Sequence, residues 1–93
     1  MIEEKQAFFE KFKDVEASKF NSLIGKYLLK LREFFGMSQS EVAKAMKVSR
    51  HCVHNIENGV NQKKISFSTF KKYLAVFKDD VSVDDFLRWC NFK

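Results

Sequence analysis

The stretch Ser38–Gly59, SQSEVAKAMKVSRHCVHNIENG, decides the fold of this chain. It predicts two short amphipathic helices joined by a tight turn, with the closing glycine as the natural end of the second helix. The first helix begins with a capping box, in which the Ser38 hydroxyl accepts a hydrogen bond from the Glu41 amide and the Glu41 carboxylate reaches back. Lys47 lies in the expected turn, and Ser49 caps the second helix.

The second of these helices has two faces of different chemistry. Val53 and Ile56 are apolar and are predicted to face the core. The opposite face carries side chains of the kind that hydrogen-bond to base edges and phosphates in a DNA groove, namely Arg50, His51, His54, Asn55 and Asn58. A solvated polar face is the plainer interpretation of the same residues. No metal ion or cofactor is expected, because a structural zinc ion needs four ligands and no second cluster accompanies the two histidines.

Composition favours a single all-α domain. The 93 residues include no Pro and three Gly, so long helices meet few breakers and β-turn signals are scarce. The formal net charge is +5, and residues 47–72 alone carry six basic residues against one acid. A basic segment favours a polyanionic partner, although a Lys-rich surface that only aids solubility gives the same count.

Other features of the sequence concern location. No apolar run approaches the length needed to cross a membrane, and the N-terminus is too charged for a signal peptide. Cys52 and Cys90 fit neither a metal knuckle nor a disulfide framework. These features predict a protein of the reducing cytoplasm without a membrane partner.

The segment before the helix pair contains two further predicted helices. Phe8 and Phe12 lie one turn apart and mark an amphipathic helix within residues 2–17. Asn21 or Ser22 is expected to cap the next helix, which ends near the first glycine-containing turn, at position 36. We therefore expect residues 1–20 to form an N-terminal helical extension and residues 21–93 to form the main domain.

Two more helices, capped by Ser66 and Ser82, are expected after the pair. The last of them carries aromatic residues spread around it and is the better candidate for a homodimer interface: Phe86, Trp89 and Phe92. The Phe-rich N-terminal helix is a second candidate surface, for a protein partner. Burial in the core is the simpler alternative for both sets of aromatic residues.

At this point the chain resembles the Cro/CI-type helix-turn-helix family, also called the Xre family, from about Leu23 to Phe77. The resemblance implies a compact five-helix lambda-repressor-like domain, here with an additional N-terminal helix. Small Ala43 lies where the two motif helices cross closely. The other matching features are Gln39 at the first helix start, the apolar residues Val42, Met46, Val48, Val53 and Ile56, the closing run Ile56-Glu57-Asn58-Gly59, and Leu31-Arg32 before Gly36.

By this resemblance, the second motif helix enters the major groove of double-stranded DNA. The implied base-contacting residues are Arg50, His51 and Asn55, and the implied DNA-backbone contacts are Gln39, Ser49, Asn58, Lys63 and Lys64. The family also implies a salt bridge between Arg32 and Glu57. Arginine suits the O6 and N7 atoms of guanine, whereas backbone contacts set the register without reading sequence.

Two positions depart from the family pattern. Lys47 stands where the turn usually has Gly, and a positive φ there costs a non-Gly residue about 1 kcal/mol. The usual Pro after the recognition loop is missing, with Lys63 and Lys64 in its place.

Two classes of function follow from the sequence. The first is a sequence-specific DNA-binding transcriptional regulator, a repressor acting as a homodimer on a palindromic operator. The alternative is a protein-interaction module, such as a toxin-binding antitoxin that also represses its own operon. An enzyme is not expected, because the chain has no Gly-rich phosphate loop and no nucleophile signature.

Overall fold

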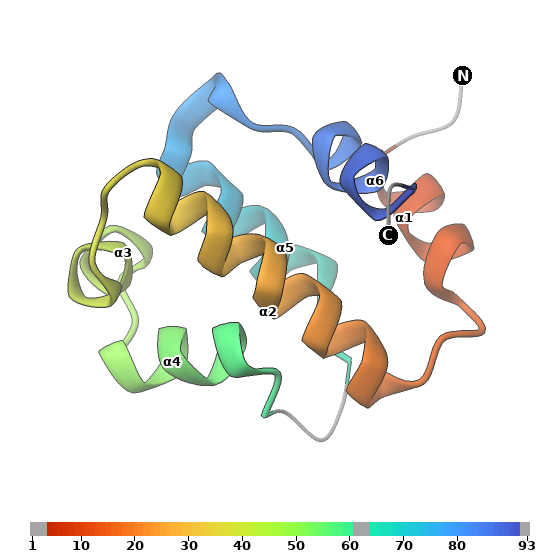
Figure 1. Cartoon of the computed structure of the whole chain (residues 1–93), viewed down its shortest axis with the longest axis horizontal. Helices are drawn as coiled ribbons and strands as arrows, with labels where there is room; N and C mark the ends of the chain where they lie inside the picture. The colour runs from red at the N-terminus through yellow and green to blue at the C-terminus, as the bar shows by residue number, and fades with distance from the viewer. Residues whose placement is uncertain (1–3, 61–63, 92–93) are drawn as a thin grey trace.

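The computed structural model describes residues 4–60 and 64–91, and these ranges form helices joined by short connections. The elements in chain order are α1 (Glu4–Phe12), α2 (Ala17–Phe34), α3 (Gln39–Met46), α4 (Arg50–Asn58), α5 (Phe67–Leu74), the 3₁₀ helix η1 (Ala75–Asp80) and α6 (Val83–Asn91) (Figure 1). The all-α prediction is confirmed, including the additional helix at the N-terminus.

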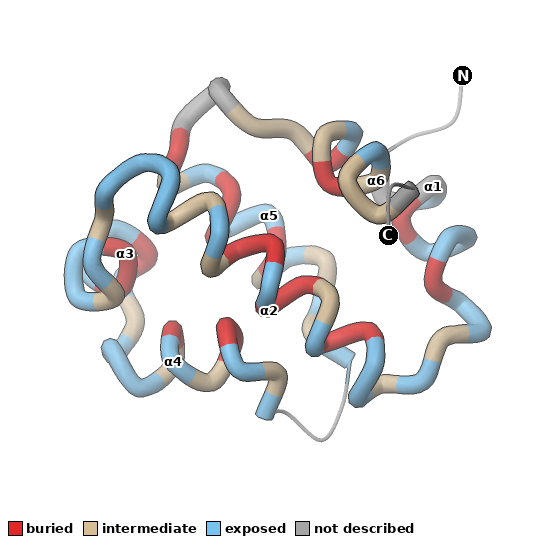
Figure 2. Tube along the Cα trace, viewed as in Figure 1, coloured by how far each residue is buried: buried red, intermediate tan, exposed pale blue. Residues whose placement is uncertain are grey.

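The long helix α2 runs through the middle of the molecule, and the other helices surround it (Figure 1). Its inward face carries Phe20, Ile24, Tyr27 and Leu28, which are all buried because they recur at helical spacing. α4 packs against α2 and α3, whereas α1 packs against α6 at the other end of the molecule. Figure 2 shows the buried positions of α3 and α4 on the sides that face α2.

The N-terminal helix α1 shares the core of the rest of the chain. Phe8 is 1% exposed, and its ring stacks on Phe70 with 5.2 Å between centroids. Phe12 is also buried and packs edge-on against Phe20, at 5.0 Å. α2 begins at Ala17, so the expected boundary between residues 20 and 21 falls inside a helix. The predicted extension is therefore built into the fold.

Serine caps begin the helices on either side of the turn, as predicted. Ser38 Oγ accepts from the Glu41 amide at 3.1 Å, and Glu41 Oε1 accepts from the Ser38 amide at 2.8 Å. Ser49 Oγ accepts from the Cys52 amide at 3.1 Å. Ser66 and Ser82 cap α5 and α6 in the same way. Each cap satisfies an amide that a helix leaves unpaired at its first turn.

The expected cap of α2 at Asn21 or Ser22 is wrong. The helix begins one turn earlier, with Glu16 as the N-cap residue and without a side-chain cap. Asn21 is 2% exposed, and its Oδ1 accepts from the Ile65 amide at 2.8 Å. The side-chain amide of Asn21 therefore does not cap a helix but binds the backbone at Ile65, which holds the segment before α5 against α2.

The turn between α3 and α4 contains the departure noted in the sequence. Lys47 adopts φ 61° and ψ 43°, in the left-handed region, and its amide bonds back to the carbonyl of Lys44 at 3.2 Å. Gly36 and Gly59 also have positive φ, at the ends of α2 and α4. Among the described residues, Lys47 is the non-glycine residue with this conformation. The turn therefore holds a lysine in a conformation that glycine adopts without strain.

Replacing Lys47 with Gly should therefore raise the free energy of unfolding by about 1 kcal/mol. The measurement is chemical denaturation, with a higher midpoint and an unchanged slope. Lys44→Gly is the matched control, because Lys44 is exposed inside α3 and the same change there should cost about 1 kcal/mol. Equal effects at the two positions would contradict the strain assigned to Lys47.

Candidate functional site

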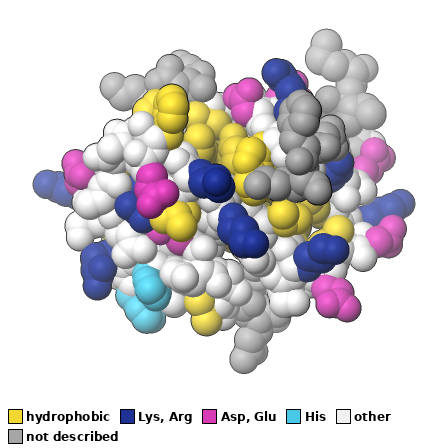
Figure 3. All heavy atoms as spheres, in the orientation of Figure 1, with side chains coloured by type: hydrophobic (Ala, Val, Ile, Leu, Met, Phe, Trp, Pro, Cys, Tyr) yellow, Lys and Arg dark blue, Asp and Glu magenta, His cyan; other side chains and the backbone are white. Residues whose placement is uncertain are grey.

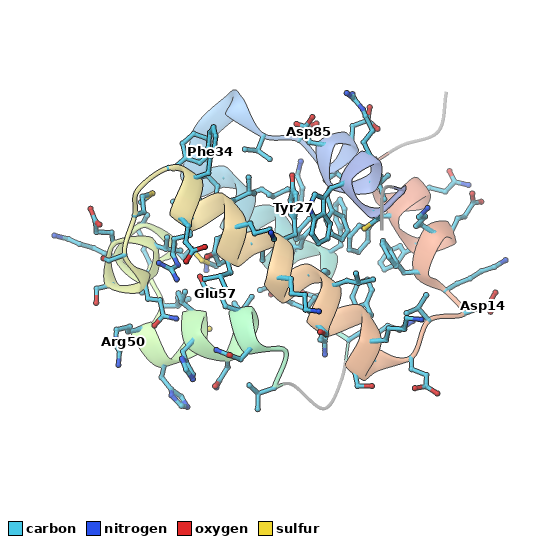
Figure 4. All side chains as sticks on the ribbon, viewed as in Figure 1. Asp14, Tyr27, Phe34, Arg50, Glu57 and Asp85 are labelled. Atoms are coloured by element: carbon cyan, nitrogen blue, oxygen red, sulfur yellow. The ribbon has the colours of Figure 1, made fainter. Side chains whose placement is uncertain are left out.

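Helix α4 turns one face to the core and the other to solvent. Val53 and Ile56 are buried, and they pack α4 on its neighbours. Arg50 projects from the start of α4 on the side away from α2 (Figure 4). The remaining residues of the predicted polar face are also outward: His51, His54 and Asn58 are exposed and Asn55 is half-buried. The helix therefore presents a ridge of hydrogen-bonding side chains.

A side-chain bridge joins Arg50 to the interior. Arg50 Nη1 donates to Gln39 Oε1 at 3.2 Å, and Gln39 Nε2 donates to Glu57 Oε1 at 3.0 Å. The amide of Gln39 thus uses its oxygen and its nitrogen within the protein. The contact orients the guanidinium of Arg50, because one of its donors is held by a half-buried neighbour.

Glu57 is the centre of the polar network inside the motif. Arg32 Nε lies 2.7 Å from Glu57 Oε2, and Arg32 Nη2 lies 3.1 Å from Glu57 Oε1, which is a bidentate ion pair. Arg32 also donates to the carbonyl of Met37 at 2.9 Å. The pair that the family resemblance implied thus ties the end of α4 to α2 and to the start of the motif.

Tyr73 belongs to the same network, and its role there was not predicted from the sequence. Its hydroxyl donates to Glu57 Oε2. Burial raises the pKa of Tyr73 above its ordinary value, and the neighbouring carboxylate raises it further. Burial alone would also raise the pKa of Glu57, but hydrogen bonds from Arg32, Tyr73 and Gln39 hold it below its ordinary value. Glu57 is therefore ionised and Tyr73 is neutral at physiological pH.

The burial of Glu57 decides the electrostatics of the α4 surface. It is the single acid among residues 47–72, and it is buried against Arg32. Every exposed charged side chain that the structure describes in that segment is consequently basic. A surface of this kind attracts a polyanion, because no exposed carboxylate of this segment opposes the attraction.

An open hollow of about 380 Å³ lies between α4 and the start of α5. Its α4 side is lined by Ser49, His51, Cys52, Asn55 and Ile56, and its α5 side by Ile65 and Thr69. Thr69 was not predicted as a site residue. Its Oγ1 accepts from Ser66 Oγ at 2.9 Å, within the cap of α5. Its position three residues after the predicted cap Ser66 was the sequence feature that could have indicated where it lies. The hollow widens the polar ridge into a concave surface.

Of the five predicted backbone contacts, Asn58 and Lys64 lie on different parts of the surface. Asn58 Nδ2 donates to the carbonyl of His54 at 2.8 Å, so it remains on the exposed ridge of α4. Lys64 Nζ instead donates to the carbonyl of Phe12 at 2.8 Å and lies 5.5 Å above the ring of Phe20. The structure therefore brings Lys64 to the junction of α1 and α2 and not to the ridge. Lys63 lies outside the described residues.

One of the three aromatic residues expected at a dimer interface is fully buried. Phe86 is 0% exposed, and its ring contacts those of Phe70 and Tyr27 at 5.0 Å each. Its prediction as an interface residue is wrong, because the ring fills the core where α1, α5 and α6 meet. Trp89 is half-buried beside Tyr27, and Phe92 lies outside the described residues.

Two further findings concern the whole described part of the chain. The rings of His51 and His54 lie side by side with 6.4 Å between centroids, but no group of three His, Cys, Asp or Glu side chains suited to a metal ion occurs within residues 4–60 and 64–91. No helix in these ranges is both long and apolar enough to span a membrane.

Comparison with known families gives one result. Residues 25–83, which make up more than half of the chain, match the family described as a helix-turn-helix domain. Comparison with curated proteins and with solved structures gives no match. Because the matched range holds α3, the turn at Lys47 and α4, the chain belongs to the helix-turn-helix domain family.

Proposed function

We propose that this protein is a transcriptional regulator that reads double-stranded DNA by placing α4 in the major groove. The observation that carries the proposal is the outward ridge of α4, which is polar and positive while its other face is fixed in the core. Arg50, His51 and Asn55 are the proposed base contacts. They lie at the start and middle of the helix, which is the part that enters the groove in proteins of this kind.

Contacts to the DNA backbone are proposed at the edges of the ridge. Gln39 and Ser49 stand at the beginnings of α3 and α4, where free amides and the helix dipole favour a phosphate. Asn58 lies at the far end of α4, and Thr69 faces the hollow beside it. Lys63 remains a proposal from the sequence. Lys64 is not proposed as a backbone contact, because its ammonium group donates a hydrogen bond to the carbonyl of Phe12 at the end of α1.

Repression as a homodimer on a palindromic operator is the specific form of this proposal. One recognition helix reads few base pairs, so a two-fold dimer with half-sites about 34–36 Å apart supplies the missing specificity. The burial of Phe86 removes one residue from the expected interface, and the proposal does not depend on that residue. Selection of bound sequences from random DNA, with the mass of the complex measured alongside, tests it. A non-palindromic site bound by one copy would contradict it.

Arg50→Ala should lower affinity for the selected DNA site by about 1–3 kcal/mol and relax preference at one base position. The reason is the loss of a charge-assisted bidentate contact to a guanine edge. Binding is measured by titration at fixed salt. Arg88→Ala is the matched control, because Arg88 is an exposed arginine on α6, paired with Asp84 at 3.5 Å and outside the ridge.

The two arginine variants distinguish base reading from general charge. Removing either arginine lowers the net charge by the same amount, so a pure charge effect would weaken all sequences equally in both variants. The proposed role of Arg50 in base recognition would be contradicted if Arg50→Ala kept the full sequence preference. It would also be contradicted if Arg88→Ala weakened binding by as much as Arg50→Ala.

A second candidate function is a protein-interaction module, including an antitoxin that represses its own operon. One observation favours it. Phe34 is 81% exposed at the end of α2, far from the burial expected of such a side chain. This function is compatible with DNA binding, since the exposed phenylalanine and Arg50 lie on opposite sides of α2 (Figure 4).

A further inference from the structure

A shallow apolar groove runs between α2 and α6, on the side of α2 away from α4. Its volume is about 300 Å³, and its walls are Tyr27, Lys30, Leu31, Phe34 and Trp89. Figure 3 shows hydrophobic side chains gathered along the middle of this face, with Lys and Arg side chains among them. The groove is separate from the ridge of α4 and from the hollow beside it.

Phe34 makes this surface unusual. The ring stands at one end of the groove and contacts the ring of Phe35, at 5.2 Å between centroids. Phe35 turns back and stacks on Phe77 at 4.9 Å, so the fold uses Phe35 and leaves Phe34 outside. Keeping a phenyl ring in water forgoes about 1.5–3 kcal/mol of burial energy. Contiguous exposed apolar surface of this kind marks an interaction site.

The floor of the groove is already shielded from water. Tyr27 is buried, and its ring packs against Trp89 at 5.2 Å. Burial, with Asp85 nearby, raises the pKa of Tyr27 to about 12. A rigid aromatic floor with one protruding ring is suited to the apolar side of a helix, which fills such a groove at positions i, i+3 or i+4, and i+7.

Charge indicates the chemistry of the occupant. Lys30 is the charged side chain in the groove wall, and it forms no ion pair within residues 4–60 and 64–91. The acids of α6 are engaged, because Asp85 Oδ2 accepts from the Ser82 amide at 2.9 Å and Asp84 pairs with Arg88. Glu33 lies three residues after Lys30 on α2 and so on a neighbouring part of the helix surface, but no ion pair joins the two within the described residues. A carboxylate on the partner would therefore meet an unpaired ammonium group.

A second copy of the chain fits the groove poorly. A two-fold axis through it would bring Lys30 of both copies to the same interface, where like charges repel. Arg50 lies on the opposite side of α2 from Phe34, so the α4 ridges of such a dimer would face away from each other (Figure 4). Neighbouring half-sites on one face of a duplex require the recognition helices to face the same way.

We propose that this groove docks a short amphipathic helix of another protein, with apolar side chains against Phe34 and Trp89 and an acidic side chain against Lys30. The inference goes beyond DNA binding and does not depend on it. Because groove and ridge lie on opposite sides of α2, the partner and DNA bind at the same time. The surface would thus connect a DNA-bound regulator to a second protein.

The test uses helical peptides of about 15 residues displayed as a random library and selected against the full chain. Trp89 is the single tryptophan of the sequence and lines the groove, so its fluorescence reports binding of each selected peptide. Enriched peptides should be acidic with helical apolar spacing. Phe34→Ala should weaken them about tenfold or more, as expected for an anchor residue, and Lys30→Glu should weaken them also.

Phe9→Ala is the control, because Phe9 is another exposed phenylalanine, 50% exposed on α1 and outside the groove, and its loss should leave peptide affinity unchanged. The proposal is overturned if no sequence is enriched, if the enriched peptides are neutral or basic, or if Phe34→Ala leaves their affinity intact. It is also overturned if the chain dimerises in solution and Phe34→Ala makes it monomeric. Competition between peptide and the selected DNA site would refute simultaneous binding.

Discussion

Arg32→Met is expected to lower the free energy of unfolding by about 3 kcal/mol, because it leaves the carboxylate of Glu57 buried without its counter-ion. The side chain of Glu57 is 1% exposed and that of Arg32 is 13% exposed, so water cannot replace the lost guanidinium. Tyr73 and Gln39 still donate to the carboxylate, which places the loss at the lower end of the range for breaking a buried pair. Denaturant unfolding measures it.

The double variant Arg32→Met with Glu57→Gln separates an uncompensated charge from lost packing. A neutral amide at position 57 retains an oxygen that accepts from Tyr73, so the double variant should be more stable than Arg32→Met alone. Equal or greater loss in the double variant would mean that the cost of Arg32→Met is lost packing around its aliphatic stem.

The pKa of Glu57 should shift in opposite directions in the native chain and in Arg32→Met, so the two proteins should differ in how their stability depends on pH. In the native chain the pKa of Glu57 lies below its ordinary value of 4.5, so its contribution to stability is present above about pH 4.5 and is lost as pH falls through the lowered pKa. In Arg32→Met, burial dominates and raises that pKa, so protonation relieves a buried charge. The stability gap between the two proteins should therefore narrow as pH falls below neutrality. A gap that widens toward acid would contradict this assignment.

Local signals made the helix pair predictable from sequence. The capping box at Ser38, the cap at Ser49 and the closing Gly59 each act over three or four residues, so their residue types and spacing determine the local geometry. The strained turn at Lys47 was anticipated because the family resemblance supplied the backbone conformation that the residue itself disfavours. The outward residues of α4 followed from helical periodicity alone.

Contacts across long stretches of sequence were less predictable. Asn21 has the right side chain for a helix cap, and only the position of Ile65, 44 residues away, reveals its role as an acceptor in the core. Lys64 looked like a phosphate contact until the fold brought it to Phe12. Phe86 and Phe34 are the same residue type on amphipathic helices, yet one is buried and the other exposed, because α1 covers the first. Such choices depend on how helices pack, which spacing does not specify.

Gly25 is the most important residue that the sequence features did not point to. It determines how close α4 can lie to α2. A Cβ atom built at this position would lie 2.4 Å from the carbonyl oxygen of Glu57 and 2.7 Å from that of Ile56. Both are backbone atoms near the end of α4, so neither can swing away as a side chain does. Ala43 was suggested as the small residue where α3 and α4 cross, and no residue was suggested for the approach of α2 to α4, which uses a residue with no side chain at all.

Gly25→Ala should lower the free energy of unfolding by about 3 kcal/mol or more, because the two helices must separate to admit the methyl group. Helix propensity alone gives the opposite sign, since Ala in a helix interior is favoured over Gly by about 1 kcal/mol. The contact distance decides the outcome, because no relaxed packing tolerates carbon and oxygen at 2.4 Å. DNA affinity at a temperature where the variant is folded should fall as well, since the same shift displaces the recognition helix.

Gly36→Ala is the control: a Cβ there meets nothing within 4 Å, and its φ of +68° costs about 1 kcal/mol without moving α4. If Gly25→Ala were as stable as the native chain, α2 and α4 would have to lie farther apart than the structure places them.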